Sequence, residues 1–182
     1  MRFKIDELDV YFPYPAVYKE QYEYMSQLKK ALDARGSVIL EMPTGTGKTV
    51  SLLSLIMSYL QAYPDSFKKL IYCTRTVPQM EKTLSEVHFI FESQMKEEGV
   101  KPKLLAVGLS AKKNLCIHPK VTSHSAIRKK TEAECKKLTA PWIRQAYKGH
   151  FQQDEHLCGF YEGFTDRQEN LFFEEGVYSL AD

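Results

Sequence analysis

The sequence has no long apolar run, few cysteines and no internal repeat. No apolar stretch approaches the ~18 residues that a membrane-spanning helix needs, and the N-terminus lacks the apolar segment of a signal peptide. We therefore expect no membrane association and an intracellular chain, in which the four cysteines are reduced and free to hold a metal. The cysteines form no C-x-x-C pair, so their spacing alone is a weak metal signal.

The formal net charge of +2 hides two blocks of opposite sign. Residues 101–150 carry twelve Lys and Arg against two acids, whereas residues 151–182 carry one Arg against eight acids. The basic block predicts a surface for a polyanion, although an ordinary solvated face explains the same charges equally well.

The strongest motif is a glycine-rich stretch, Glu41-Met42-Pro43-Thr44-Gly45-Thr46-Gly47-Lys48-Thr49, which precedes a leucine-rich segment. It predicts a phosphate-binding loop, because Gly45 and Gly47 let the backbone wrap a polyphosphate. Lys48 would reach the β- and γ-phosphates, and Thr49 would offer a hydroxyl to Mg²⁺. Met42 departs from G-x-x-x-x-G-K-[ST], which has glycine there. The alternative is a glycine-rich turn before an ordinary core helix.

Hydrophobic periodicity predicts three helices alternating with three short strands. The helices cover Tyr18–Leu32 with Gly36 as its cap, Val50–Leu60, and the segment from Pro78 to Gly99. The strands cover Ser37–Leu40, Lys69–Cys73 and Lys103–Leu109, and the aromatic segment Tyr11–Tyr18 is expected to be extended and packed. This order predicts an α/β fold of the P-loop NTPase type, with a mainly parallel sheet and the nucleotide at the carboxyl ends of its strands.

The periodicity fades after Leu109, where the chain becomes basic and bears cysteines. We therefore divide it into an ATP-binding domain, residues 1–109, and an inserted subdomain, residues 110–182. The second part contains Cys116, Cys135 and Cys158, and a fourth metal ligand could come from one of its histidines: His118, His124, His150 or His156. Cys73 falls in a predicted strand and is expected to be a small buried residue.

Four blocks of residues lie along nearly the whole chain: Val10–Tyr14 with Tyr18, Glu20–Gln21 and Tyr24–Met25; Leu40–Leu53; Leu70–Pro78; and Lys113–Pro119. Together they resemble the XPD-type iron-sulfur DNA helicases of superfamily 2, which include the helicase subunit of the transcription and repair factor TFIIH. The resemblance implies a RecA-like ATP-binding motor domain with an iron-sulfur insertion.

The resemblance also implies roles for single residues. Gln21 matches the adenine-recognising glutamine, and the segment Met42 to Thr49 matches the loop for ATP and Mg²⁺. Thr74, Arg75 and Thr76 match a segment that contacts single-stranded DNA through its phosphates, to which Lys112 would add a contact where relatives often have arginine. Cys116, Cys135 and Cys158 match three of the four ligands of a [4Fe-4S] cluster.

The same resemblance implies ATP-driven 5′-to-3′ unwinding in the nucleus, with TFIIH subunits as partners in transcription initiation and nucleotide excision repair. The fourth cluster cysteine, the D-E-A-H motif and the second motor domain are not in the sequence. We therefore interpret the chain as an N-terminal fragment that does not hydrolyse ATP alone. The alternatives are an inactive nucleotide-binding or adaptor module, a zinc-dependent nucleic-acid adaptor and a small-molecule kinase.

Overall fold

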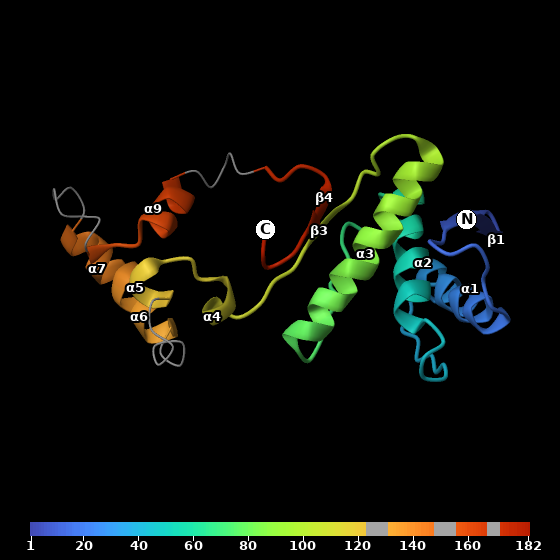
Figure 1. The fold of residues 1–182 in the computed structure, drawn as a ribbon, viewed down its shortest axis with the longest axis horizontal. Coiled ribbons are helices and arrows are strands. Elements are labelled where there is room, and N and C mark those ends of the chain that lie inside the picture. Colours follow the sequence, from blue (N-terminus) through green and yellow to red (C-terminus); the bar gives the residue numbers. More distant parts are fainter. Residues whose placement is uncertain (123–130, 148–155, 167–171) are drawn as a thin grey trace. The chain divides into compact units, whose positions relative to one another are not determined.

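The computed structural model describes residues 1–122, 131–147, 156–166 and 172–182. The chain forms two compact units, of which the first contains Met1–Gly108 and Glu174–Asp182 and the second contains Leu109–Phe173 (Figure 1). The sequence analysis placed all of residues 110–182 in one subdomain, whereas the structure returns the last nine residues to the first unit.

The first unit begins with an antiparallel hairpin that the sequence analysis missed. Strands β1 (Arg2–Ile5) and β2 (Leu8–Tyr11) pair with Ile5 opposite Leu8, and Asp6 has a φ of 52° in the turn. Ile5, Leu8 and Val10 are buried against the neighbouring helices, so the hairpin contributes to the core.

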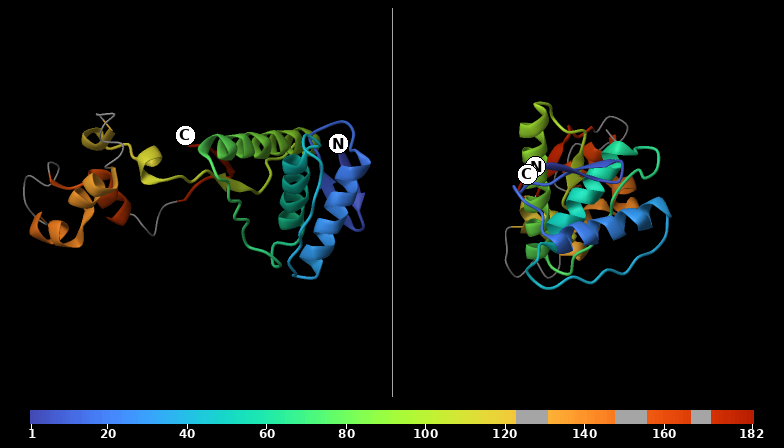
Figure 2. Two further views of the ribbon diagram at one scale, coloured as in Figure 1. Left: turned by 90° about the horizontal axis from the view of Figure 1, so that it is seen from below. Right: turned by 90° about the vertical axis from the view of Figure 1, so that its right-hand side faces the viewer.

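Three long helices form the body of this unit. They are α1 (Lys19–Asp33), α2 (Lys48–Ala62) and α3 (Val77–Glu98), and α2 lies between the other two (Figure 2). Leu55 and Tyr59 of α2 pack with α1 and the hairpin, whereas Leu53 and Met57 pack with α3. A helix covered on two sides needs apolar residues on most of its circumference, which accounts for the leucine-rich sequence.

The predicted helices are present, and the ends of α3 follow the predicted signals. Thr76 caps its N-terminus by accepting a hydrogen bond from the Gln79 N–H, and Gly99 ends it with a φ of 71°. The predicted cap of α1 at Gly36 is wrong: Ala34 caps the helix, and Arg35 takes the left-handed conformation with a φ of 50°.

The predicted mainly parallel sheet is only partly formed in the described residues. One parallel pair joins β3 (Leu105–Val107) to β4 (Gly176–Tyr178), with Ala106 opposite Val177. Residues 37–40 and 69–73 form no strand, and Ile39 and Ile71 are 99% and 77% exposed. A buried parallel strand needs backbone partners and covered faces, and the described part of the chain gives these two segments neither.

The second unit consists of short helices. They are α4 (Lys112–Leu115), α5 (Pro119–Thr122), α6 (Thr131–Thr139), α7 (Pro141–Tyr147) and α9 (Gly159–Asp166). Arg144 of α7 donates two hydrogen bonds, of 2.6 and 2.9 Å, to the Glu162 carboxylate of α9, which ties these helices together. Among the described residues of both units, no helix is long and apolar enough to cross a membrane.

Candidate nucleotide-binding site

The glycine-rich loop leads directly into the N-terminus of α2. Gly45 and Gly47 have φ values of 82° and 81°, in the left-handed region where residues with a Cβ are strained, and Gly47 is the N-cap of α2. The free N–H groups of the first helical turn therefore follow a backbone that only glycine adopts easily. This is the arrangement in which a helix N-terminus binds a phosphate.

Gln21 fastens this loop to the start of α1. Its side-chain amide is buried, accepts a hydrogen bond from the Tyr18 N–H at 2.9 Å and donates one to the Thr46 carbonyl at 2.9 Å. A Cβ at Gly47 would lie 2.6 Å from the Gln21 Nε2 atom, so glycine is also needed here for space. The role of Gln21 in reading adenine stays a prediction, whereas the structure shows that its amide positions the loop.

Lys48 turns back toward its own loop. Its ammonium donates hydrogen bonds to the carbonyls of Met42 at 2.7 Å and Pro43 at 2.9 Å, and the Thr46 hydroxyl donates to the same Pro43 carbonyl at 2.6 Å. Met42 and Pro43 thus hold the lysine through backbone oxygens. A phosphate would offer the same ammonium stronger, charged acceptors.

A cavity of about 600 Å³ opens above the loop. Gln21 and the residues from Thr44 to Thr49 line it, whereas Met42 and Pro43 do not. The volume lies within the range of small-molecule sites in proteins. Lys48 and Thr49, which are predicted to bind phosphate and Mg²⁺, therefore line the same cavity as Gln21, which is predicted to recognise adenine.

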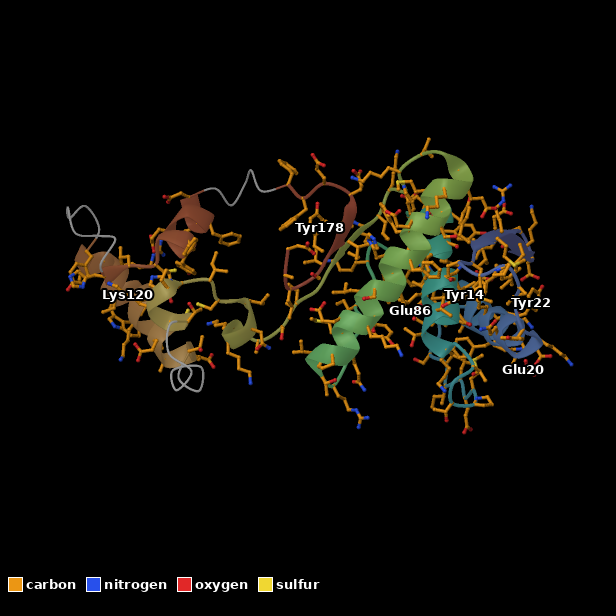
Figure 3. The ribbon with its side chains drawn as sticks, viewed as in Figure 1. Tyr14, Glu20, Tyr22, Glu86, Lys120 and Tyr178 are labelled. Carbon is orange, nitrogen blue, oxygen red and sulfur yellow. The ribbon has the colours of Figure 1, made fainter. Side chains whose placement is uncertain are left out.

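Further lining residues escaped the sequence analysis. Tyr14, Pro15, Ala16 and Tyr18 line the cavity from the segment before α1, and Lys82 and Glu86 line it from α3. Tyr14 and Glu86 are labelled in Figure 3. In the sequence, the only signal that links Lys82 and Glu86 is their i,i+4 spacing, which places them on one face of a helix. The segment around Tyr14 is also less packed than predicted, since Phe12 is buried but Tyr14 and Tyr18 are 43% and 71% exposed.

A buried lysine holds the hairpin against α1 in the same unit. Lys29 is 2% exposed and contacts Glu7 and Asp33 at 2.9 Å each, and Tyr59 and Tyr63 donate hydrogen bonds to these two carboxylates. The hydrogen bond from Lys29 lowers the pKa of Glu7 to about 2. Burial lowers the pKa of Lys29, but the hydrogen bonds to Asp33 and Glu7 outweigh it and raise that pKa above its usual value.

The predicted DNA-contacting residues lie in both units. Thr74, Arg75 and Thr76 directly precede α3, where Arg75 is exposed and the Thr76 hydroxyl caps the helix. Lys112 is exposed at the start of α4 in the second unit.

The three cysteines of the second unit lie at or in different helices. Cys116 follows α4, Cys135 lies in α6 and Cys158 precedes α9, and each is partly exposed. Thiolates are suitable ligands for iron or zinc. Even so, the described residues contain no group of three or more His, Cys, Asp or Glu side chains placed to hold a metal.

Several expectations about single residues are corrected or fall outside the structure. Cys73 is exposed rather than buried, because its segment forms no strand. His118 is buried, and its Nδ1 atom has no hydrogen-bond partner among the residues that the structure describes. His156 stacks on Tyr147, whereas His124 and His150 lie outside the described residues.

Comparison with known proteins identifies the family. The DEAD_2 family matches residues 72–182. The chain is 50% identical over 182 residues to the "General transcription and DNA repair factor IIH helicase subunit XPD" of Arabidopsis thaliana, a match that covers 100% of the chain and 24% of that relative. The protein of the same name from Schizosaccharomyces pombe is 42% identical over 182 residues, with 100% of the chain and 23% of the relative covered.

A more distant relative is the human "Regulator of telomere elongation helicase 1", which is 26% identical over 156 residues, covering 64% of the chain and 12% of that protein. The chain thus spans about a quarter of the length of the XPD relatives that it matches. The family implies a P-loop, RecA-like α/β fold, and the described residues are mixed α/β with small sheets. The chain therefore belongs to the DEAD_2 family and, within it, to the XPD-type helicases.

Proposed function

We propose that the chain supplies the ATP-binding part of an ATP-dependent DNA helicase. The observation that carries this proposal is the loop with its two left-handed glycines, which ends in Lys48 and Thr49 at the N-terminus of α2 and lines a cavity of about 600 Å³. A turn before an ordinary core helix needs neither this backbone nor such a cavity. The same features argue for a nucleoside triphosphate as the ligand.

Each loop residue has a defined task in this proposal. The N–H groups from Gly45 to Thr49 donate to the phosphate oxygens, which the positive end of α2 also attracts. Lys48 exchanges the carbonyls of Met42 and Pro43 for the β- and γ-phosphates, and the Thr49 hydroxyl binds Mg²⁺. Gln21 keeps the loop in register with α1 through Thr46 and has one amide hydrogen left for adenine.

The wider role rests on the relatives. Their names place them in factor IIH, in transcription and DNA repair. We propose the same for the protein to which this chain contributes: 5′-to-3′ unwinding, assembly with TFIIH subunits, and action in the nucleus in transcription initiation and nucleotide excision repair. Single-stranded DNA would contact Thr74, Arg75 and Thr76, and Lys112, through its phosphates, which makes binding independent of sequence and sensitive to salt.

We also propose that Cys116, Cys135 and Cys158 ligate a [4Fe-4S] cluster. The support is the chemistry of three thiolates within one unit, together with the family; the described side chains are not gathered for it. Such a cluster would hold the short helices together by its bonds to them. Chain prepared without oxygen should show broad visible absorption that Cys135→Ser removes; a colourless chain that contains zinc would refute the cluster.

Nucleotide titration tests the central proposal. We expect Mg²⁺–ATP and Mg²⁺–ADP to bind the chain, and Lys48→Ala to weaken binding by roughly tenfold to a hundredfold, since it removes a charged hydrogen bond worth about 1.5–3 kcal/mol. Lys30→Ala is the matched control, because Lys30 is an exposed lysine in the last turn of α1, at the opposite end of that helix from Gln21. Equal affinities of the wild type and Lys48→Ala would overturn the site.

We expect this binding to occur without turnover. The sequence has no D-E-A-H motif, and the missing Mg²⁺-binding acid stabilises the transition state by several kcal/mol in this class of enzyme. Phosphate release from ATP by the 182-residue chain at rates typical of helicases would contradict this expectation. Binding without turnover also fits a nucleotide-binding or adaptor module. Binding of single-stranded DNA that Arg75→Ala weakens would favour the helicase fragment over that alternative.

A further inference from the structure

Two charged side chains of α3 line the nucleotide cavity, away from the glycine-rich loop. Lys82 is exposed and Glu86 is half-buried, and their i,i+4 spacing puts both on one face of the helix. Within the described part of the chain, no ion pair or hydrogen bond involves the Glu86 carboxylate. The Glu86 carboxylate is therefore free to accept hydrogen bonds from a ligand in the cavity.

The fold fixes where this carboxylate stands. Val87 and Ile90, on the adjoining face of α3, pack against Val50 and Leu53 of α2 in one core cluster. These contacts hold α3 beside the first turn of α2, which forms the phosphate end of the cavity. Glu86 is therefore positioned by a packed core rather than by a loop.

Tyr14 lines the cavity from the segment before α1 and contacts α3 directly. The ring of Tyr14 packs edge-on against Phe89 of α3, with 5.5 Å between centroids, and lies 5.8 Å from the ring of Phe12. Tyr14 and Glu86 both line the cavity, and Figure 3 labels the two side chains. An aromatic ring and a carboxylate, next to a phosphate site, suit the nucleoside half of a nucleotide better than a second anion.

We propose that Glu86 binds the ribose of the nucleotide by accepting hydrogen bonds from its hydroxyl groups. The inference rests on the proposed function, because it assumes a nucleotide whose phosphates occupy the loop. A carboxylate is acceptor-only when ionised, and the ribose hydroxyls are paired donors that a single carboxylate can accept together. The positive charge of Lys82, one turn away, offsets the repulsion between Glu86 and the triphosphate.

The test compares four nucleotides on the whole chain: ADP, 2′-deoxy-ADP, 3′-deoxy-ADP and IDP. We expect the wild type to bind ADP roughly tenfold more tightly than at least one deoxy analogue, which is the effect of losing one hydrogen bond to a charged group. In Glu86→Ala this preference should fall to about onefold to twofold. Glu92→Ala is the matched control, a half-buried glutamate of the same helix outside the cavity, and it should keep the full preference.

The outcomes separate the two proposals. If the wild type binds no nucleotide, or binds it equally well after Lys48→Ala, the nucleotide site itself fails. If binding depends on Lys48 but Glu86→Ala keeps the ribose preference, only the role of Glu86 is refuted. A variant that loses discrimination between ADP and IDP instead would assign Glu86 to the base and overturn the ribose contact. Unchanged thermal unfolding of Glu86→Ala would show that the effect is local.

Discussion

Replacing Gly47 by alanine should destabilise the chain more than the same change at Gly45. Both glycines have φ values near 80°, so each alanine suffers the same left-handed penalty of about 1–2 kcal/mol. At Gly47 the new Cβ would also lie 2.6 Å from the Gln21 Nε2 atom, whereas a Cβ at Gly45 meets nothing within 4 Å. Gly45→Ala is therefore a control that has the strain without the clash.

The extra cost comes from the displaced amide. Gln21 is buried and joins the Tyr18 N–H to the Thr46 carbonyl, so moving it breaks at least one hydrogen bond and leaves a buried group unpaired. That penalty is about 1–3 kcal/mol. We expect the free energy of unfolding in urea to fall by about that much more in Gly47→Ala than in Gly45→Ala.

A double-mutant cycle isolates the contact. In a Gln21→Ala background the amide is absent, so the extra cost of Gly47→Ala over Gly45→Ala should shrink to what the Val50 Cγ1 atom, 3.3 Å from the new Cβ, imposes. Equal losses for the two glycines in the wild-type background would refute the argument, because they would show that Gln21 moves aside at no cost. Nucleotide affinity is a poorer readout here, since both alanines alter the backbone that holds the phosphates.

Two further predictions concern the salt bridges. The pKa of Glu7 is lowered in the folded chain to about 2, so its contribution to stability is present above the unfolded value near pH 4.5 and is lost as the pH falls toward 2. In Lys29→Met, the free energy of unfolding in urea should therefore depend less on pH across that window. A pH profile unchanged from the wild type would exclude the contact. Arg144→Lys should lose the two-pronged bond to Glu162 and destabilise the second unit, seen as faster amide exchange in α9, whereas unchanged exchange would show that the pair contributes nothing.

The helices and the loop were predictable because their signals are local. Thr76, Pro78 and Gly99 mark the ends of α3 by the hydrogen bonds and dihedral angles that each residue type favours. The glycine-lysine-threonine sequence likewise determines the backbone of the loop. The adenine-reading role of Gln21 stays a prediction, and its bond to Thr46, 25 positions away, needs the tertiary structure.

The strands were less predictable because a strand depends on its partners. Ser37–Leu40 and Lys69–Cys73 have the composition of buried strands, yet strand pairing requires neighbours that the described residues do not provide. The β1–β2 hairpin was missed for the opposite reason: its turn, Asp6–Glu7, lacks the glycine that usually marks one. Glu86 of the candidate site was missed because one acid on a helix carries no signal until the cavity is seen.

The parallel pairing of β3 with β4 bears on the order in which the chain folds. The two strands are separated by residues 109–173, which belong to the other unit, so their pairing closes a long loop. Loop closure costs entropy that grows with the length of flexible chain, and contacts distant in sequence slow folding. If the second unit folds first, it shortens that loop and hastens the pairing. Substitutions that unfold the second unit should then slow the folding of the first, even where they alter none of its contacts.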